Sequence, residues 1–475
     1  GTDNLRSESP IIIGAYTFIP TNVGLTDSAV TANYQFALDE FTTNAPGGGL
    51  QNGRRKIAMV ACSVNAPETY TESINHLIDV VQVPAVIAPL PSADLVTLFD
   101  TKGRDNGVFF LSPVDADSSL VTLEDDGLVW NILGRASDLA SAYVPLLDRT
   151  EAYIRAERGG QTDPIRVALI TDETRFQRDI SDELTGTQPL FFNGQSASAN
   201  FTSGTCGAPA GADAGASAGP CFMSRSAPSD PTATGAAAAY TALIGELAAF
   251  RPDVIVSTTG YSFVTEVMEP LENYLEDDAK PFYLMGPYHA DLPELRDAVV
   301  GGNATTCNAV ACPLSERVLG INFESSRDPT LVESYRLRFG SEYPQYNLIF
   351  ENFYDSAWYM FYALAAAGNV GELTGADIRQ GMRRLVWAEP TREFGIGDSD
   401  VSDVLYALGS IGTNGIQLDG TMGLPDFDPA TGARNTLGSA FCFSATGTYM
   451  ADVLRYDASP AMTGNTSGTC VPAGF

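Results

Sequence analysis

Basic side chains are scarce in this 475-residue chain. It has 27 Lys and Arg residues against 58 Asp and Glu, two histidines, and a formal net charge of −31. A partner with dense negative charge, such as nucleic acid or an anionic membrane surface, would be repelled by this balance. We therefore expect no nucleic-acid partner.

Long apolar runs are also missing. None approaches the ~18 residues that a transmembrane helix requires. The 44% of hydrophobic residues are enough for two sizeable buried cores in a chain of this length. No signal peptide is visible in GTDNLRSESP, so we expect a mature or trimmed chain.

The seven cysteines show no CxxC spacing, and with two histidines they argue against a zinc site. Local pairs that close polar loops suit an oxidising compartment, so we predict a periplasmic or extracellular protein. Cys62 ends an apolar run and is expected to be a buried thiol. Three disulfides are predicted: Cys206–Cys221, Cys307–Cys312 and Cys442–Cys470.

Short apolar runs alternate with helical patterns in two similar series. Strands joined through a helix lie parallel, and ligands of such sheets bind at their carboxyl edge. We predict an α/β fold with two Rossmann-like lobes and a hinge of crossing strands; one long doubly wound sheet is the alternative. The first series is RRKIAMVAC (54–62), PAVIAPLPS (84–92) and GVFFLSP (107–113), and the second is PIRVALITDE (164–173), PDVIVSTTG (252–260) and KPFYLMGP (280–287).

The chain is predicted to cross between lobes near 133–137, 320–325 and 393–397. Lobe 1 then comprises residues 11–135 and 322–395, and lobe 2 comprises 136–321 and 396–475. Residues 193–235 are rich in Ala, Gly and Ser and are predicted to form a disulfide-stapled insertion. The tail from about residue 394 is predicted to be strand-like, with a hairpin in GTMGLPDFDPATGARN.

Enzymatic motifs are weak, and we predict that the chain is not an enzyme and needs no cofactor. GASAG (215–219) matches G-x-S-x-G but lacks the strand–turn–helix context that the motif requires. His289 is open to three interpretations: a general base, a ligand contact, or a polar residue on a surface loop. Two carboxylate pairs could bind calcium or serve as turn formers: Asp398 with Asp400, and Asp426 with Asp428.

Five segments, in this order, resemble the type I periplasmic binding proteins of the branched-chain amino acid group, the solute receptors of ABC importers: IIIGAYTFIPTNVG, FFLSP, DVIVSTTGY, FYLMGPY and NFYDSAWYMFYALAAAG. The Gly420–Gly423–Phe427–Asp428 spacing also resembles a late hairpin of this family. The resemblance spans about residues 11–457 and fails over 193–235. It implies two lobes joined by three crossing strands, with the ligand held in the cleft by hinge closure.

In the amino-acid binders of this family, a helix start and a loop of the first lobe hold the ligand carboxylate. Free N–H groups and the helix dipole make an anion there physically reasonable. The carboxylates of Asp115 and Asp117 stand where the family usually has Ala and Thr, and they would repel a ligand carboxylate unless they turn to solvent. The matching residues are Ser92 and Ala93 at the helix start, and Val114, Asp115 and Ala116 in the loop.

In the second lobe, Tyr288 stands where the family has an acidic residue that binds the α-ammonium. Its loss removes a charge-assisted hydrogen bond worth ~1.5–3 kcal/mol. Either Asp115 or Asp117 supplies the charge, or the ligand is not an ordinary amino acid. An aromatic wall for an apolar, ring-bearing or cationic ligand is predicted, with core packing as the alternative for each ring: Tyr16, Phe18, Phe176, Tyr261 and Tyr288.

The resemblance thus implies an extracytoplasmic, monomeric receptor that binds a small molecule and delivers it to an ABC transporter permease. The expected ligand is an amino acid or an amino-acid-like compound with an apolar or aromatic portion. A lipid anchor is a further expectation for this location. The alternative is a ligand-sensing ectodomain of a signalling system.

Overall fold

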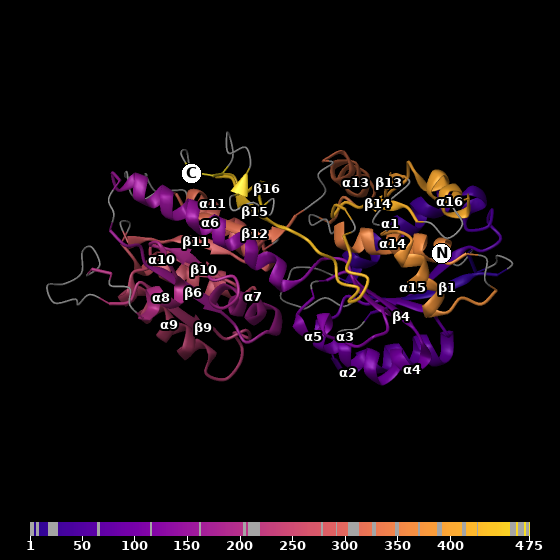
Figure 1. The fold of residues 1–475 in the computed structure, drawn as a ribbon, viewed down its shortest axis with the longest axis horizontal. Coiled ribbons are helices and arrows are strands. Elements are labelled where there is room, and N and C mark those ends of the chain that lie inside the picture. Colours follow the sequence, from indigo (N-terminus) through magenta and orange to yellow (C-terminus); the bar gives the residue numbers. More distant parts are fainter. Residues whose placement is uncertain are drawn as a thin grey trace. The chain divides into compact units, whose positions relative to one another are not determined.

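The computed structural model describes residues 4–5, 9–17, 27–63, 67–114, 116–160, 163–202, 206–207, 219–276, 279–290, 292–302, 313–324, 329–346, 351–368, 371–386, 392–410, 415–424, 426–456, 462–463, 470–471 and 475. The chain forms two compact units (Figure 1). Unit 1 consists of Gly1–Arg135 and Ser325–Thr436, and unit 2 of Ala136–Glu324 and Leu437–Phe475.

Unit 1 is built on a five-stranded sheet with the order β2-β1-β3-β4-β5. Every neighbouring pair in it is parallel. Because helices cover both faces, strands such as FFLS are buried along their whole length, as expected for a parallel sheet. The strands are β1 (Ile11–Tyr16), β2 (Ile57–Cys62), β3 (Ala85–Ile87), β4 (Phe109–Ser112) and β5 (Val129–Asn131).

The two faces of this sheet carry different helices (Figure 1). One face packs on α2 (Pro67–Asn75) with η3 (His76–Val81), on the helical run α3 (Ser92–Leu98), η4 (Phe99–Gly103) and α4 (Arg104–Asn106), and on α5 (Ser118–Val121). The other face packs on α1 (Asp27–Asn44), α14 (Glu351–Ala366) and α15 (Gly375–Arg383), which are joined by rings such as Phe41 and Trp358. Unit 1 also holds η2 (Pro46–Gly48), α13 (Pro329–Glu342), β13 (Glu393–Gly395), α16 (Val401–Ser410) and β14 (Gln417–Asp419).

Unit 2 is built on an eight-stranded sheet with the order β17-β16-β15-β12-β11-β10-β6-β9. Five neighbouring strands are parallel: β12, β11, β10, β6 and β9. The strands β15, β16 and β17 extend the sheet in antiparallel pairing. The strands are β6 (Val167–Thr171), β9 (Phe222–Ser226), β10 (Val254–Ser257), β11 (Phe282–Met285), β12 (Val318–Phe323), β15 (Gly438–Phe443), β16 (Tyr449–Tyr456) and β17 (Met462–Thr463).

Helices cover this sheet as well. One face packs on α6 (Ala136–Glu157), beside which lies α7 (Arg175–Thr185). The other face packs on α9 (Ala236–Phe250), η5 (Val264–Met268) with α10 (Glu269–Tyr274), and α11 (Pro293–Gly302). The remaining elements are β7 (Phe191–Phe192), β8 (Gln195–Ser196), α8 (Ala197–Thr202), η7 (Pro287–His289) and α12 (Leu314–Arg317).

The two sheets repeat one strand order, which confirms the predicted α/β architecture but changes the alignment of the repeat. The order β2-β1-β3-β4-β5 corresponds to β9-β6-β10-β11-β12. The counterpart of β6 is therefore β1, and the counterpart of β2 is β9. The prediction that aligned 54–62 with 164–173 was wrong because β9 lies inside 193–235, a segment predicted to be only an insertion.

The division of the chain differs from the prediction at its last boundary. It falls after Arg135, Glu324 and Thr436, so residues 396–436 belong to unit 1 and not to lobe 2. The crossing predicted near 393–397 was wrong because β13 pairs in parallel with β14 within unit 1. The strand-like tail was also wrong over α16, whose Val401, Val404 and Leu408 are buried at helical spacing. The predicted hairpin is present, with an antiparallel bridge between Phe427 and Arg434.

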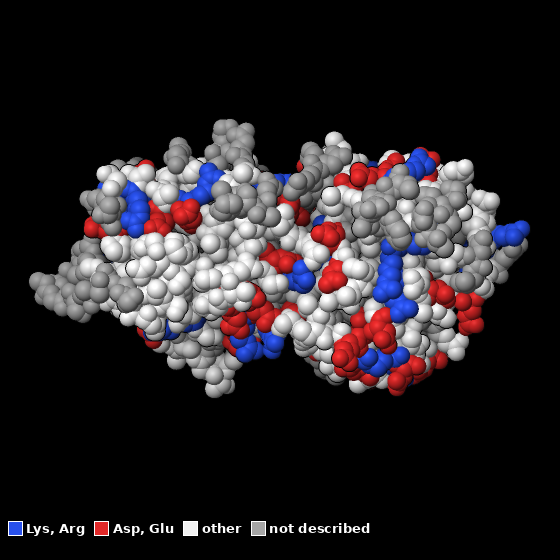
Figure 2. All heavy atoms as spheres, in the orientation of Figure 1, with Lys and Arg blue, Asp and Glu red and all other residues white. Residues whose placement is uncertain are grey.

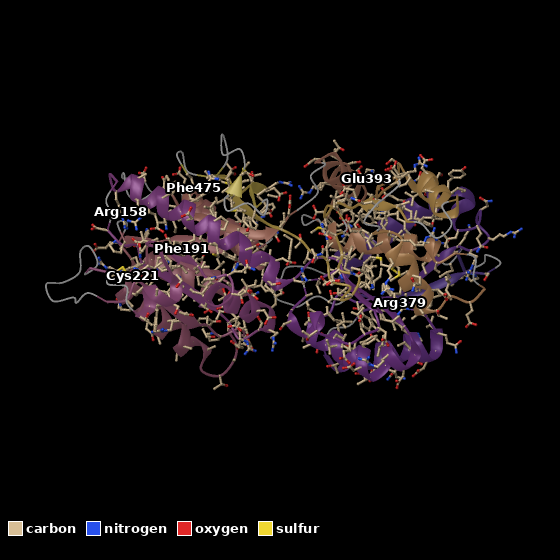
Figure 3. The ribbon with its side chains drawn as sticks, viewed as in Figure 1. Arg158, Phe191, Cys221, Arg379, Glu393 and Phe475 are labelled. Carbon is tan, nitrogen blue, oxygen red and sulfur yellow. A yellow bond between two sulfur atoms is a disulfide. The ribbon has the colours of Figure 1, made fainter. Side chains whose placement is uncertain are left out.

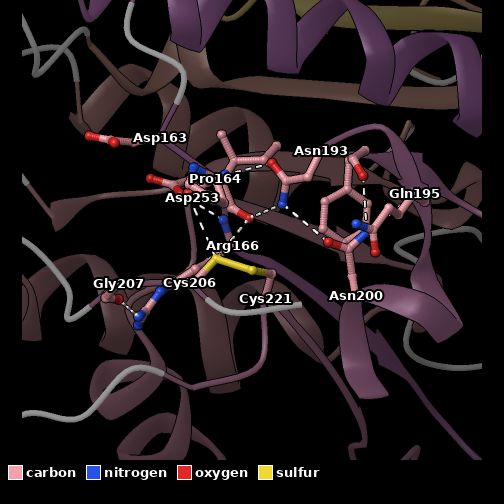
Figure 4. Close-up of a disulfide and its surroundings, with 12 residues drawn as sticks. Asp163, Pro164, Arg166, Asn193, Gln195, Asn200, Cys206, Gly207, Cys221 and Asp253 are labelled. Atoms are coloured by element: carbon pink, nitrogen blue, oxygen red, sulfur yellow. Dashed lines mark hydrogen bonds between the residues drawn. A yellow bond between two sulfur atoms is a disulfide. The ribbon is translucent and has the colours of Figure 1, made fainter. Parts of the chain in front are cut away.

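Two of the three predicted disulfides, Cys206–Cys221 and Cys442–Cys470, are present. Cys307 and Cys312 lie outside the described residues. Figure 3 labels Cys221, and Figure 4 shows its surroundings, where the Asn193 side chain bonds both the N–H and the carbonyl of Ile165 at 2.9 Å. Cys62 is half-exposed at the end of β2, so the prediction of a buried thiol was wrong.

Charged residues on the face drawn in Figure 2 lie in mixed groups of both signs. In unit 1, for example, Lys102 pairs with Asp79 at 2.7 Å, and Arg104 pairs with Asp100 at 2.6 Å. Such exposed pairs contribute about 0–1 kcal/mol each to stability. Among the helices described, none combines the length and the apolar character needed to cross a membrane.

Candidate functional site

The structure brings together five of the predicted residues of unit 1 at the carboxyl ends of β3 and β4: Ser92, Ala93, Val114, Ala116 and Asp117. Ser92 is the first residue of α3, one position after the N-cap Pro91. The Ser92 hydroxyl is buried and accepts a hydrogen bond from the Asp117 N–H at 3.1 Å. Ala93 follows it and is exposed. The helix start and the loop after β4 therefore form one connected edge.

The loop after β4 is held from two further segments. The Val114 carbonyl accepts a hydrogen bond from the Asn131 side chain, and the Ala116 N–H donates to the Gly134 carbonyl at 2.9 Å. Asp117 is the N-cap of α5, and its carboxylate accepts a hydrogen bond from the Ser119 N–H at 2.8 Å. Because Asp117 is buried and engaged in this cap, it is poorly placed to bind a ligand ammonium.

Three other predicted residues have different outcomes. Tyr16 has no exposed surface, and its hydroxyl donates to the Tyr70 carbonyl at 2.9 Å, so it packs in the core beneath α2. The placement of Tyr16 in an aromatic wall was therefore wrong, because α2 covers the end of β1 where its ring lies. Phe18 and Asp115 lie outside the described residues.

Three predicted aromatic residues of unit 2 form a continuous group, which we name the aromatic ladder: Phe176, Tyr288 and Tyr261. The ring centroids of Phe176 and Tyr288 are 5.7 Å apart, and those of Tyr288 and Tyr261 are 5.2 Å apart. Such separations are typical of favourable ring pairs. Phe176 is only 5% exposed and supports Tyr288 from behind, whereas Tyr261 and Tyr288 keep part of their surface open.

The ladder is assembled from three segments that follow strands at one edge of the unit 2 sheet: the start of α7, the loop after β10, and η7. Phe176 follows β6, Tyr261 follows β10 and Tyr288 follows β11, and these three strands are neighbours. At Gly286 the third segment comes close to the end of β10, since a Cβ there would lie 3.3 Å from the Ser257 carbonyl oxygen. The Tyr143 hydroxyl of α6 donates to the Met285 carbonyl at 3.1 Å. A small residue and a buried tyrosine thus set the position of Tyr288.

Asp172, which was not predicted, joins the first two of these segments. It directly follows β6 and is 1% exposed. Its carboxylate accepts hydrogen bonds from the Thr174 N–H at 2.9 Å and from the Gly260 N–H at 2.7 Å. Burial raises the pKa of Asp172, and these donors act in the opposite direction. An Asp followed two residues later by Thr, at the end of an apolar strand, was the available signal for such a turn.

His289 is buried with no exposed surface, so the surface-loop interpretation was wrong. Its ring lies edge-on to Phe263 with centroids 6.1 Å apart, and its Nδ1 lies 3.3 Å from the Gly286 carbonyl oxygen. Burial lowers the pKa of His289 to about 4, which keeps the ring neutral at pH 7. A general base must reach the substrate and works best with a pKa near 7, and the buried ring of His289 meets neither condition.

The carboxylate pairs considered for calcium have structural partners. Asp398 pairs with Arg338 at 2.7 Å, Asp400 accepts a hydrogen bond from the Gly395 N–H at 3.0 Å, and Asp428 accepts one from the Ala430 N–H at 2.9 Å. Across the part of the chain that the structure describes, no group of three or more His, Cys, Asp or Glu side chains could hold a metal ion. GASAG lies outside this part except for Gly219.

Comparison by sequence finds no relative: no family model matches the chain, and no curated protein does. Comparison by structure finds many. A leucine complex of an ABC transporter substrate-binding protein from Desulfitobacterium hafniense aligns with a TM-score of 0.57 at 15% identity, covering 93% of this chain and 100% of the other. The chain has the type I periplasmic binding protein fold.

Two further structures with this fold have similar agreement. The leucine-binding protein LivK from Thermotoga maritima gives a TM-score of 0.58 at 12% identity over 95% of this chain and 99% of that one. LivJ from Streptococcus pneumoniae, in complex with isoleucine, gives a TM-score of 0.58 at 13% identity. The alignment covers 94% of this chain and 100% of LivJ. The fold predicted from the ordered segments is confirmed, and both units of the chain fall within the alignment.

Proposed function

We propose that this chain is an extracytoplasmic receptor that binds a small, amino-acid-like molecule with an apolar or aromatic portion. The aromatic ladder is the observation that carries this proposal. It lies at the carboxyl edge of a parallel sheet, where ligands of such sheets bind, and it presents two half-exposed tyrosine rings. Unit 1, taken by itself, has a polar edge at the carboxyl ends of β3 and β4, where Ser92 bonds the Asp117 N–H beside a helix start.

The partner in this proposal is an ABC transporter permease, to which a monomeric receptor delivers its ligand. The proteins of the same fold are described as ABC transporter substrate-binding proteins, which supports this choice. A periplasmic or extracellular location, with a lipid anchor, is part of the same proposal. Two disulfides that close local loops suit an oxidising compartment.

A thermal-shift screen should identify the ligand class. A ligand present at a hundred times its dissociation constant stabilises the folded protein by ~2.7 kcal/mol, enough for a clear rise in melting temperature. We expect stabilisation by compounds with an aromatic ring or a quaternary ammonium group, such as benzyltrimethylammonium. A screen in which neither these nor amino acids stabilise the protein would contradict the proposed receptor function.

Tyr288 is expected to decide between these ligands and ordinary amino acids. In the native protein, leucine, valine and phenylalanine should bind weakly, because no carboxylate at position 288 accepts their ammonium. Tyr288→Glu should improve leucine binding by about ten- to a hundredfold, the value of one charge-assisted hydrogen bond, and should weaken benzyltrimethylammonium. Isothermal titration calorimetry on both proteins measures these changes.

Tyr274→Glu is the matched control, because Tyr274 is an exposed tyrosine of the same unit and the variant adds the same charge. It should leave both affinities within about twofold, since a charge on a distant exposed site is largely screened. Micromolar or tighter binding of leucine, valine or phenylalanine to the native protein would show that another group binds the ammonium. The role assigned to Tyr288 would then have to be abandoned.

A further inference from the structure

We propose that Asp172 is the positioning residue of the aromatic ladder, fixing the start of α7, which carries Phe176, to the loop that carries Tyr261. The inference rests on the proposed function, for which the ladder is the contact surface of unit 2. The effect of Asp172 on the positions of the ladder rings can be tested in the protein without a ligand.

The two oxygens of Asp172 serve different segments. One oxygen accepts hydrogen bonds from the N–H and the hydroxyl of Thr174, at 2.9 and 2.5 Å, and Thr174 is the N-cap of α7, whose second residue is Phe176. The other oxygen accepts the N–H of Gly260 at 2.7 Å, and Tyr261 is the next residue. One carboxylate thereby sets the distance between the start of α7 and the loop after β10.

Other contacts also hold these segments: the Thr258 hydroxyl donates to the Gln177 carbonyl of α7 at 3.3 Å. The Thr258 N–H donates to the Ile170 carbonyl at 2.9 Å, which continues the strand pairing up to the loop. Ser262, after Tyr261, is anchored by the Tyr240 hydroxyl at 3.1 Å. Between Thr258 and Ser262, the Gly260 N–H donates to Asp172, and Gly260 directly precedes Tyr261. Because the carboxylate is buried, water cannot readily replace it as an acceptor.

Asp172→Asn tests this role with almost no change in volume. An asparagine has one acceptor oxygen and one amide nitrogen, so either Thr174 or Gly260 loses its acceptor and faces a donor instead. We expect the loop after β10 to move, which separates the Tyr261 ring from Tyr288. Asp172→Asn should bind benzyltrimethylammonium at least tenfold more weakly than the native protein. Glu173→Gln should bind it with unchanged affinity.

Glu173→Gln is the matched control because Glu173 is the adjacent carboxylate. It is exposed and accepts hydrogen bonds from the N–H and hydroxyl of Ser229, in a loop without a ladder ring. A second variant, Gly260→Ala, keeps the N–H but adds a Cβ 3.3 Å from the Asp172 carboxylate. Gly260→Ala should move Tyr261 in the same direction by a smaller amount. It provides the test if Asp172→Asn fails to fold.

The deciding measurement is the ¹⁹F spectrum of fluorotyrosine introduced site-specifically in place of Tyr261, and separately in place of Tyr288, without ligand. Neighbouring rings shift these signals in the native protein, and Asp172→Asn should move both toward the position of an exposed tyrosine. Unchanged signals in Asp172→Asn and Gly260→Ala would overturn the positioning role. If the native protein binds no tested compound while the signals still move, the proposed function fails and the role of Asp172 stands.

Discussion

Replacing Asp355 by alanine should lower the free energy of unfolding of unit 1 by about 3–5 kcal/mol, since it removes a fully buried, hydrogen-bonded carboxylate. Asp355 lies in α14 and binds the turn that begins at Gly420. Its carboxylate accepts hydrogen bonds from the N–H and hydroxyl of Thr421, at 3.1 and 2.5 Å, and from the Met422 N–H at 2.9 Å. Alanine leaves these three donors buried without an acceptor.

The turn matters because it is also tied to the segment that leaves unit 1. Arg434, from the second half of the hairpin, donates to the carbonyls of Met422 and Leu424 and, at 3.3 Å, to that of Ile132. Ala433 bridges to Asn131 in parallel. Loss of the Asp355 contacts therefore loosens the turn itself and also the residues beside Arg135, where the first segment of unit 1 ends.

The effect should depend on pH. Burial raises the pKa of Asp355 to about 7, from an unfolded value near 3.8. The folded state then holds its proton more tightly than the unfolded state, so the stabilisation is complete below the unfolded pKa and is lost as pH rises through 7. Between pH 5.5 and 8.5 the advantage of the native protein over Asp355→Ala should shrink by about 2 kcal/mol.

Tryptophan fluorescence during urea unfolding measures these changes in the correct unit. The two tryptophans within the described residues, Trp130 and Trp358, lie in unit 1, and Trp358 is one turn from Asp355. Asp355→Asn is the matched variant; it retains one acceptor oxygen and should lose less stability than the alanine variant. A loss below 1 kcal/mol for Asp355→Ala at pH 5.5 would refute the structural role given to this carboxylate.

Gly381→Ala should destabilise unit 1 by about 1–3 kcal/mol or more, although alanine normally favours a helix. Gly381 lies in α15 at its contact with α14. A Cβ there would overlap the Ala363 carbonyl and lie 2.9 Å from the Ala367 nitrogen. The first is a backbone atom of α14 and the second belongs to the residue directly after it, so the strain can be relieved only by moving α15 away from this end of α14.

Gly340→Ala is the control for helix propensity. Gly340 lies within α13 of the same unit, and a Cβ there meets nothing within 4 Å. This variant should gain up to ~1 kcal/mol, the difference between Gly and Ala in a helix. Equal effects of the two substitutions in urea unfolding would contradict the close approach of α15 to α14.

The strands whose side chains are buried on both faces could be predicted from their apolar runs alone. Runs such as VIVS and FFLS are apolar throughout because helices cover both sides of their sheets, and this local pattern is readable without coordinates. The two observed disulfides were also predictable, because each pair closes a local loop. The ladder residues Phe176, Tyr261 and Tyr288 were predicted through the resemblance, as an aromatic wall.

Features that depend on residues distant in the sequence could not be predicted from local patterns. Strand β9 is an edge strand with Phe222 and Met223 buried and its last three residues exposed, so its pattern alone does not distinguish it from a loop. The boundary after Thr436 follows from β14 pairing with β13 and from the Asp355 contacts with residues 421–422. Tyr16 and Tyr288 are both tyrosines in strand-end regions, yet α2 buries the first while three converging segments leave the second half-exposed. Burial of a single side chain is set by whatever packs over it, and that information lies elsewhere in the chain.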